Sequence, residues 1–265
     1  NSWNVSNVTI MQSLFEGASS FNQPIDNWDV SNVTNMNWMF FGSAFNQDIS
    51  TWTTSSLQTT KSMFALSSFN QNVNSWDMSN VTDITFMFGD CPFNQPLNDW
   101  DTSSVENMTS VFENNTVFNK DLDQWDTSNV TQMGWMFNGA SSFNGNITTW
   151  NTANVENMRT MFQNADSFNQ DISSWNVSNV TEMSYMFWSA SIFNQDLSSW
   201  CVSQITSEPT GFDDNAVNWT APKPNWGTTC PTPTPTPSIS ESVTPTPTPT
   251  PSTPSGLNTI FIEWV

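Results

Sequence analysis

The chain contains no histidine, and this absence removes most familiar catalytic arrangements. Without imidazole, the 265 residues cannot form a Ser-His-Asp or Cys-His pairing. Glycine is scarce, at nine residues, and no glycine-rich phosphate loop is visible. Two carboxylates could in principle serve a glycosidase, but nothing in the sequence marks such a pair in a cleft. We therefore expect no enzymatic activity and no cofactor.

Positive charge is almost as rare as histidine. Four Lys and Arg residues stand against 24 Asp and Glu residues, which gives a formal net charge of −20 at pH 7. Such a chain repels phosphate backbones and anionic surfaces, so we expect no nucleic acid partner. No apolar run of about 18 residues is present, so we expect no membrane insertion. The chain begins inside a repeat, without Met or a signal segment, and we interpret it as a mature or fragmentary product.

Cysteine is limited to three residues. Cys201 and Cys230 bracket the point where the repeat described below decays, which favours a disulfide that closes the end of the stack. In the loop-closure model, a bridge over about 30 residues contributes roughly 3 to 4 kcal/mol. Cys91 stands where other repeats have Ser or Ala, and we expect a buried free thiol there. The spacing of the three cysteines offers no zinc site.

What the chain has in place of these groups is a repeat of 24 or 25 residues. Phe-Asn occurs eight times, a Trp follows seven residues after each of these Phe residues, and a second Phe follows twelve residues after each Trp. A fixed period of about 20 to 50 residues indicates stacked units that cannot bury their apolar faces alone. The stability of such an array comes from contacts between neighbouring units.

One repeat, residues 172–191, has the pattern of a strand followed by a helix. Its first part, Ile172 to Val180, follows the L-x-x-L-x-L-x-x pattern of leucine-rich-repeat strands, with Trp175 in a Leu position. From Val180 to Ala190 the apolar residues recur at steps of three, four and three, which is one face of a helix. We therefore predict an α/β repeat solenoid, a leucine-rich-repeat-like stack of short parallel strands and short helices.

The composition divides the chain into four parts. We assign residues 1–200 to the repeat solenoid, 201–230 to a disulfide-linked C-terminal cap, 231–255 to a Pro/Thr-rich stalk and 256–265 to an apolar end. Alternating Pro and Thr favours an extended polyproline II tail with a rise of about 3.1 Å per residue. Such tracts are typical of O-glycosylated stalks, although an unmodified disordered linker has the same composition. The O-glycosylation candidates are Thr232, Thr234, Thr236, Thr246, Thr248 and Thr250.

The last ten residues alternate in a way that fits a short strand. Ile260, Phe261, Ile262 and Trp264 supply its apolar side chains. This segment either begins a further domain or adds to an edge of a neighbouring subunit, as in donor-strand assembly. Head-to-tail contacts of the second kind propagate into filaments when the rotation does not close.

Sequons of the form N-x-Ser/Thr recur along the chain and are glycan acceptors in secreted eukaryotic proteins. Asn114, Asn146 and Asn218 stand outside the repeat phase and are the stronger N-glycosylation candidates. In the repeated set, the Asn side chain can instead cap a backbone turn, so we expect modification of only some members. This set comprises Asn7, Asn32, Asn80, Asn129 and Asn179.

A row of acidic residues shares one phase of the repeat. Asp48, Asp121, Asp171 and Asp196 each follow an interior Phe by three residues. Carboxylate and carbonyl oxygens are the ligands that Ca²⁺ prefers. However, no D-x-D-x-D loop occurs, and solvated turn carboxylates explain the row more simply. A Ca²⁺ site is therefore the weaker interpretation.

Aromatic residues outside the interior phase are candidates for a contact surface. Trp38, Trp135 and Tyr185 each follow a strand Trp by ten residues, and Trp188 lies close by in the sequence. They predict a discontinuous stripe that could meet a protein partner or stack on a glycan. The Trp and Met residues that do follow the interior phase are expected in the core.

Three short segments of the sequence resemble the repeats of a known family. "FNQDISSW", "DVSNVTNM" and "MFNGASSFN" closely resemble the repeats of BspA-like leucine-rich-repeat surface proteins. The segment from Cys201 to Cys230 also resembles the C-terminal cap of such arrays. The resemblance implies surface display and adhesion or protein contact, and it carries no catalytic residues.

Together, these features predict an extracellular structural or adhesive surface glycoprotein. We expect it to self-associate or to contact other surface proteins and glycans, as a subunit of a filament or a cell-surface assembly. The alternative is a monomeric adhesin or ligand-binding module that uses one face of the solenoid.

Overall fold

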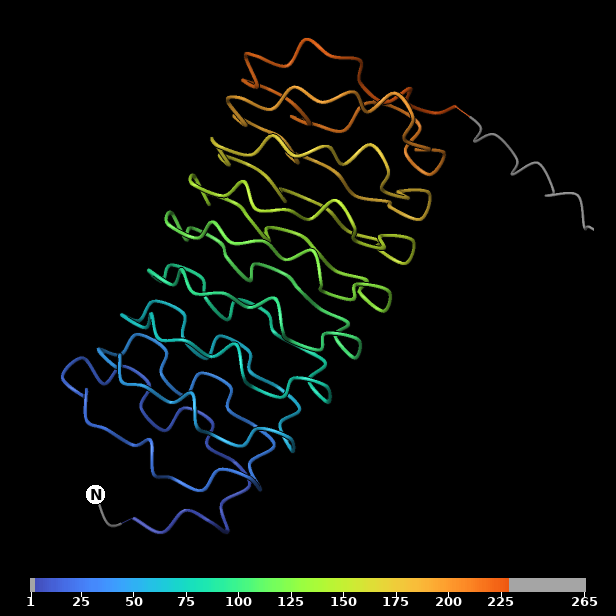
Figure 1. Cartoon of the computed structure of the whole chain (residues 1–265). Coiled ribbons are helices and arrows are strands. Elements are labelled where there is room, and N and C mark those ends of the chain that lie inside the picture. Colours follow the sequence, from blue (N-terminus) through green and yellow to red (C-terminus); the bar gives the residue numbers. More distant parts are fainter. Residues whose placement is uncertain (1–2, 229–265) are drawn as a thin grey trace, which may run out of the picture. The chain divides into compact units, whose positions relative to one another are not determined.

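The computed structural model describes residues 3–228, where the backbone forms a stack of similar coils (Figure 1). The chain divides into two units, Asn1–Cys230 and Pro231–Val265. The predicted polyproline II stalk (231–255) and apolar terminal strand (256–265) lie outside the described residues. Each coil spans one sequence repeat, because residues 24 or 25 apart are paired between neighbouring coils.

The prediction of an α/β leucine-rich-repeat-like stack of strands and helices was wrong. Residues 3–228 contain no helix, and their only strand pairing consists of isolated parallel bridges. It follows that no helix of the described part of the chain could span a membrane. The bridges link one position in each of eight successive coils, namely Ile10, Asn35, Thr59, Asp83, Asn107, Gln132, Asn157 and Glu182.

Overlapping turns occupy the segment predicted as a helix, residues 180–190. Three N–H groups donate to carbonyl oxygens three residues earlier at 3.0 to 3.2 Å, in the pairs Met186 to Met183, Trp188 to Tyr185 and Ala190 to Phe187. The alternate N–H groups of Tyr185, Phe187 and Ser189 donate to the next coil, to Thr210, Phe212 and Asp214, at 2.8 to 3.0 Å. A helix would use all of these groups within itself. The three-and-four spacing of the apolar residues is therefore the signature of stacked turns here.

The predicted strand also consists of turns. The N–H of Trp175 donates to the carbonyl oxygen of Ile172 at 3.0 Å, and that of Val180 donates to Val177 at 3.0 Å. Each turn reverses the chain locally and leaves its apolar side chains on the inner side of the coil. All four residues are buried.

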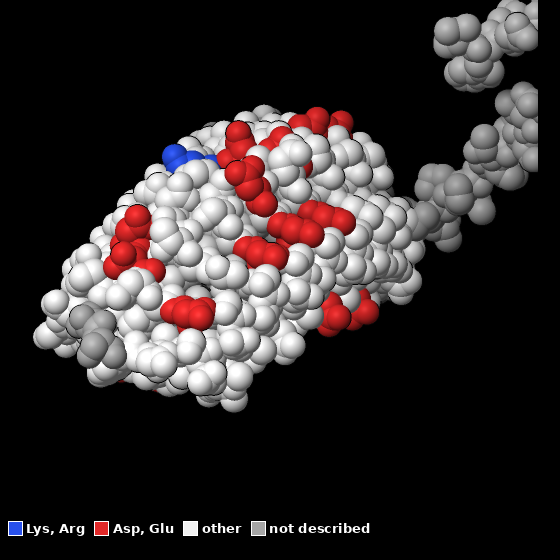
Figure 2. All heavy atoms as spheres, turned by 60° about the horizontal axis from the view of Figure 1, so that its bottom comes forward, with Lys and Arg blue, Asp and Glu red and all other residues white. Residues whose placement is uncertain are grey.

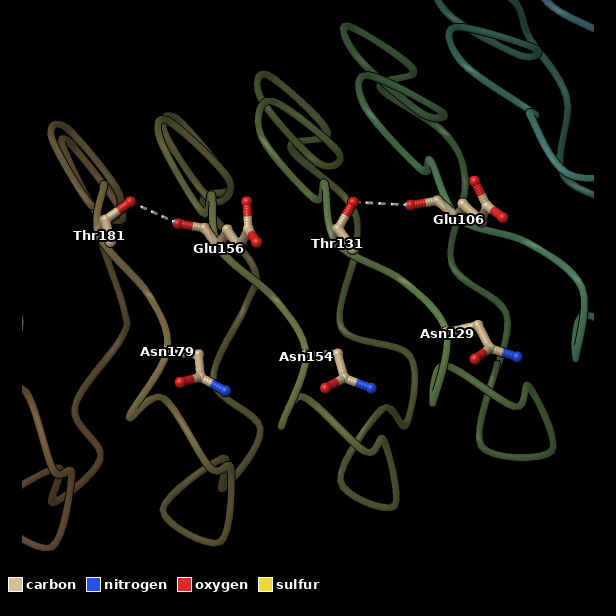
Figure 3. Close-up of a pocket in the computed structure, with 7 residues that line it drawn as sticks. All are labelled: Glu106, Asn129, Thr131, Asn154, Glu156, Asn179 and Thr181. Atoms are coloured by element: carbon tan, nitrogen blue, oxygen red, sulfur yellow. Dashed lines mark hydrogen bonds between the residues drawn. The ribbon is translucent and has the colours of Figure 1, made fainter.

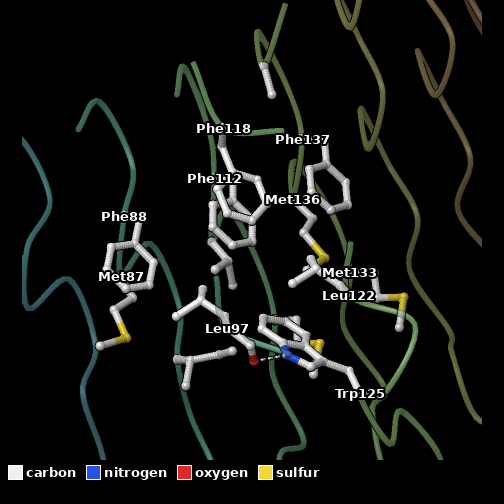
Figure 4. Packing of buried hydrophobic residues seen from close by; sticks show 14 of the residues in the cluster. Met87, Phe88, Leu97, Phe112, Phe118, Leu122, Trp125, Met133, Met136 and Phe137 are labelled. Carbon is white, nitrogen blue, oxygen red and sulfur yellow. Dashed lines mark hydrogen bonds between the residues drawn. The ribbon is translucent and has the colours of Figure 1, made fainter. Parts of the chain in front are cut away.

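Stacked aromatic rings fill the interior (Figure 4). Within one coil, the rings of Phe112 and Phe118 lie 3.9 Å apart at an interplanar angle of 13°. Between coils, Phe112 lies 5.6 Å from Phe137 at 7°, and Trp125 lies 6.3 Å from Trp150 at 7°. Large aromatic side chains contribute much of the burial energy of a core, and offset stacking adds to it. The expectation that these residues form the core is confirmed.

The Trp ladder is also a hydrogen-bond ladder. The Nε1–H of Trp125 donates to the carbonyl oxygen of Leu97 at 2.9 Å (Figure 4), and Trp150 donates in the same way to Leu122 at 2.8 Å. Corresponding bonds link each coil from Trp52 to Trp200 with the coil before it. Trp28 differs, because its buried Nε1 has no partner. Each of these carbonyls also accepts the backbone N–H of the Trp in its own turn, so the indole is its second donor and links the turn to the next coil.

A second set of polar contacts between coils explains why the sequence Phe-Asn-Gln recurs. The Oδ1 atom of Asn119 accepts a hydrogen bond from the backbone N–H of Asn144 at 2.9 Å, and Asn144 accepts one from Asn169 in the same geometry. Where Gln follows, its amide joins the same acceptor, as in the 3.0 Å contact from Gln195 Nε2 to Asn169 Oδ1. The Asn side chain thus replaces a missing backbone acceptor between coils.

Parallel ring stacking ends in the last described segment, residues 201–228. The ring of Trp219 meets Phe193 edge-on, at 4.8 Å and 86°, and is held from outside by Lys223, whose ammonium lies 5.6 Å from the indole centroid and pairs with Asp213. An edge-on ring offers no flat face to a further coil.

The cysteines differ in state. Cys201 is disulfide-bonded, while its predicted partner Cys230 lies outside the described residues, so the pairing stays a prediction. Cys91 is buried and free, and its burial raises the pKa of the thiol to about 12. This thiol is therefore a packing group at neutral pH.

The Trp hydrogen bonds can be tested with a matched pair of variants. Trp125→Phe should lower the free energy of unfolding by about 1 to 3 kcal/mol more than Trp28→Phe. The first change removes the indole hydrogen bond to the Leu97 carbonyl, which keeps only the N–H of Trp100, whereas the second removes a buried Nε1 that has no partner. Urea unfolding followed by circular dichroism measures both values. Equal losses would show that the indole hydrogen bond contributes nothing beyond ring packing.

Candidate functional site

A polar groove of about 490 Å³ follows one flank of the stack (Figure 3). Asn129, Asn154 and Asn179 lie in a row along it, one from each of three successive coils. Each Nδ2 donates to a backbone carbonyl of the preceding coil at 2.7 Å. The other lining residues are Glu106, Thr131, Glu156 and Thr181.

The side chains that line this groove also hold the scaffold together. The hydroxyls of Thr131 and Thr181 donate to the backbone carbonyls of Glu106 and Glu156, at 3.4 and 3.2 Å. The two carboxylates come from coils two repeats apart, with Thr131 between them (Figure 3). Nothing in this geometry brings the two acids onto one reacting bond.

The same ladder separates the predicted glycosylation sites into two groups. Nδ2 of Asn32, Asn80, Asn129 and Asn179 donates to a carbonyl of the preceding coil, at 2.7 to 3.0 Å. Asn218, which sequence phase placed among the stronger candidates, does the same with Ser191 at 2.7 Å. The structure thus gives these amides a backbone partner.

The remaining sequons have no backbone partner for Nδ2 in the described residues. Asn7 is exposed. Asn114 is also exposed and has only a long contact of 3.4 Å, from Nδ2 to the Asp90 carboxylate. In Asn146 the Oδ1 atom accepts from both the N–H and the hydroxyl of Thr148, at 3.1 and 2.8 Å, so its amide nitrogen stays available.

Secretion from a eukaryotic host tests this division. We expect glycans on Asn7, Asn114 and Asn146 and little or none on the bonded set of Asn32, Asn80, Asn129, Asn179 and Asn218, because a modified Nδ2 must give up or strain its bond to the coil below. Glycopeptide mass spectrometry reads each site separately. Full occupancy across the bonded set would contradict the prediction.

The predicted row of acidic residues caps turns. One carboxylate oxygen of Asp171 accepts from the N–H of Ser173 at 3.0 Å, and one of Asp196 accepts from Ser198 at 2.9 Å. Asp48 makes the same contact with Ser50, while Asp121 accepts instead from the N–H of Asn146 in the next coil. Hydrogen bonds from these serines lower the pKa of Asp48, Asp171 and Asp196.

Acidic side chains lie along the outside of the stack. Figure 2 shows several Asp and Glu residues of one face side by side in a band, with others set apart from it. Across residues 3–228, no three His, Cys, Asp or Glu side chains are grouped closely enough to hold a metal ion. The Ca²⁺ hypothesis therefore gains no support from the described part of the chain.

The capping carboxylates predict a pH dependence with a defined sign. Because their pKa values are lower in the folded chain, their stabilisation is present above the unfolded pKa of about 4 and is lost as pH falls through the folded values. We expect wild type to be more stable than Asp171→Asn/Asp196→Asn at pH 7, and the difference should be lost as pH falls through the lowered pKa values of the folded carboxylates.

Urea unfolding from pH 7 to pH 2 measures this difference. The Asn variants keep the turn acceptor, because Asn72 and Asn146 already fill it at the same phase and accept N–H groups at 2.8 and 3.1 Å. At pH 7 the variant carries two fewer negative charges, which lowers repulsion in a chain of net charge −20 and therefore acts against the expected difference. A difference that does not change with pH would exclude the carboxylate caps as its source.

The predicted aromatic stripe exists and has an additional member. Trp38, Trp135 and Tyr185 are half-buried on the outside of the coils, and Phe86 occupies the same phase in an intervening coil. All four have a left-handed backbone, with φ between 54° and 61°. Sequence reasoning missed Phe86, although it also stands ten residues after a core Trp.

Arg159 lies between two members of the stripe. Its guanidinium carbon lies 5.7 Å from the ring centroid of Trp135 and 5.4 Å from that of Tyr185. Together with Trp188 and the polar residues Asn138, Thr160 and Gln163, these side chains line an open groove of about 480 Å³. This groove joins aromatic rings to hydrogen-bonding groups.

Comparison with known families covers most of the chain. The family model described as "Mycoplasma protein of unknown function, DUF285" matches residues 1–92, 65–147 and 111–226. The chain belongs to this family. No curated protein and no solved structure matches it. The family description names no activity, so the function must be argued from the surface of the stack.

Proposed function

We propose that the protein is an extracellular adhesive surface glycoprotein in which the stacked coils act as a rigid scaffold for contacts made by the flank. The observation that carries this proposal is the use of the repeated side chains. Phe, Trp and Met side chains of successive coils are buried in the core, Asn side chains bond from coil to coil, and two open grooves of about 490 and 480 Å³ lie on the outside of the stack.

Two features of the sequence support a surface location. The repeat words resemble those of BspA-like surface proteins, for which the family implies display and adhesion. The Pro/Thr-rich segment after residue 230 has the composition of a glycosylated stalk, which would hold the scaffold away from a surface.

The end of the stack bears on how copies could assemble. In residues 201–228 the ring of Trp219 lies at 86° to that of Phe193, and Lys223 lies 5.6 Å from its centroid, so the ladder of parallel rings does not continue there. We therefore favour adhesion through the flank over end-to-end stacking at this end. A filament subunit, joined through residues 256–265, is the alternative role.

Localisation and assembly state test the proposal together. We expect an antibody against the coils to label the outside of intact cells of the source organism, and the purified full chain to be monomeric by light scattering. Filaments in electron micrographs that disappear when residues 256–265 are deleted would replace adhesion with a structural role. An exclusively internal location would overturn both.

A further inference from the structure

The aromatic stripe has a period of two coils. Position ten after the core Trp alternates between a large ring and a small residue from Trp38 to Tyr185. The series is Trp38, Ser62, Phe86, Ser110, Trp135, Thr160 and Tyr185, and in the next coil Gly211, eleven residues after Trp200, has the corresponding left-handed backbone. Neighbouring strands in a sheet lie about 4.8 Å apart, so rings in alternate coils are spaced by roughly 10 Å.

Large rings are unfavourable choices at these backbone positions. A left-handed conformation costs a residue with a Cβ roughly 1 to 2 kcal/mol, and for a bulky residue it is an outlier. Glycine would fit at no cost, as Gly211 does at φ 63°. Because the rings are only half-buried, core packing does not explain them, and such outliers point to function.

Glycines beside the rings hold them against the coils. A Cβ built on Gly211 would lie 2.5 Å from the ring of Tyr185, and one built on Gly89 would lie 2.1 Å from the ring of Phe86. A side chain at either glycine would displace the ring. These two rings are therefore supported from beneath by backbone, which fixes them as parts of a platform.

Each half of the stripe has a cation at one phase of a coil that carries no ring of the stripe. Arg159 lies between Trp135 and Tyr185, and Lys61 occupies the same phase in the coil between Trp38 and Phe86. The chain has only four basic residues, so two of them belong to this one surface.

Both cations have acidic neighbours. Lys61 pairs with Asp83 at 3.0 Å, and the charge of Arg159 acts on Glu182. The stripe therefore offers hydrogen-bond donors without an excess of positive charge.

We propose that the stripe binds a neutral linear polysaccharide that runs along the stack. Flat rings at a spacing of roughly 10 Å match the faces of every second sugar in an extended chain, since the C–H faces of sugars stack on aromatic rings. Arg159, Asn138 and Gln163 supply donors and acceptors for hydroxyl groups. A polyanion would meet balanced cations on a chain of net charge −20. The inference rests on the proposed adhesive function and names its ligand.

Native affinity electrophoresis of the full chain tests the proposal. Three gels each contain one neutral polysaccharide, namely hydroxyethylcellulose, xyloglucan or galactomannan. A fourth gel contains polygalacturonate as the charged comparison. We expect slower migration in at least one neutral gel. Trp135→Ser/Tyr185→Ser should weaken this binding at least tenfold, which corresponds to about 1.4 kcal/mol.

The serine variants have a control built into the chain. Ser62 and Ser110 already occupy the same phase with the same left-handed backbone, at φ 53° and 59°, so serine is compatible with the fold. We expect the melting temperature of the double variant to be unchanged or raised while binding falls, which a structural role for the rings would not produce. Ile192→Ala, at an exposed apolar residue outside the stripe, should alter neither.

Three outcomes would overturn the inference. In the first, none of the neutral polysaccharides slows the protein. In the second, a neutral polysaccharide slows the ring variants as much as wild type. In the third, only polygalacturonate binds, and Lys61→Gln/Arg159→Gln abolishes that binding. Antibody labelling of the outside of intact cells, together with no retardation in any neutral gel, would remove the glycan ligand and leave the adhesive function standing. If the protein binds a neutral polysaccharide in the gel but is found only inside cells, the glycan ligand stands and the adhesive surface function is overturned.

Discussion

The backbone hydrogen bond from one coil to the next is the constraint on which the rest of this structure depends. Alternate N–H groups of each turn segment point along the stack and donate to the following coil, while the others close turns within the coil. No coil can satisfy its own backbone, so each one is ordered only against a neighbour. The aromatic, indole and asparagine ladders then repeat at the same interval because the backbone fixes that interval.

This constraint also separates what the sequence could predict from what it could not. The repeat length, the buried Phe and Trp residues and the structural use of Asn were all accessible, because each depends on a position that recurs. The secondary structure was not, since Val180 to Ala190 has a spacing shared by helices and by overlapping turns. Left-handed residues such as Trp135 allow the turns, and no pattern of apolar residues reveals the sign of φ.

Some of the surface features could likewise be predicted from the sequence, and others could not. The stripe of Trp38, Trp135 and Tyr185 could be found because these residues share a phase and interrupt a polar face. The roles of Phe86 and Arg159 required the structure, because a lone cation in an acidic chain becomes informative only when two rings are found beside it. Asn218 shows the converse case, in which an off-phase sequon proved to bond like the repeated ones.

The two-coil period of the stripe restricts how such a gene could grow or shrink. Loss or duplication of a single repeat between Trp52 and Trp200 keeps the ring and indole ladders intact, because these coils repeat the same interior contacts. It would nevertheless place two rings, or two small residues, in adjacent coils and break the alternation outside. Recombination that preserves the stripe must therefore exchange repeats in pairs, so the smallest heritable unit of this surface is about 50 residues, twice the unit of the fold.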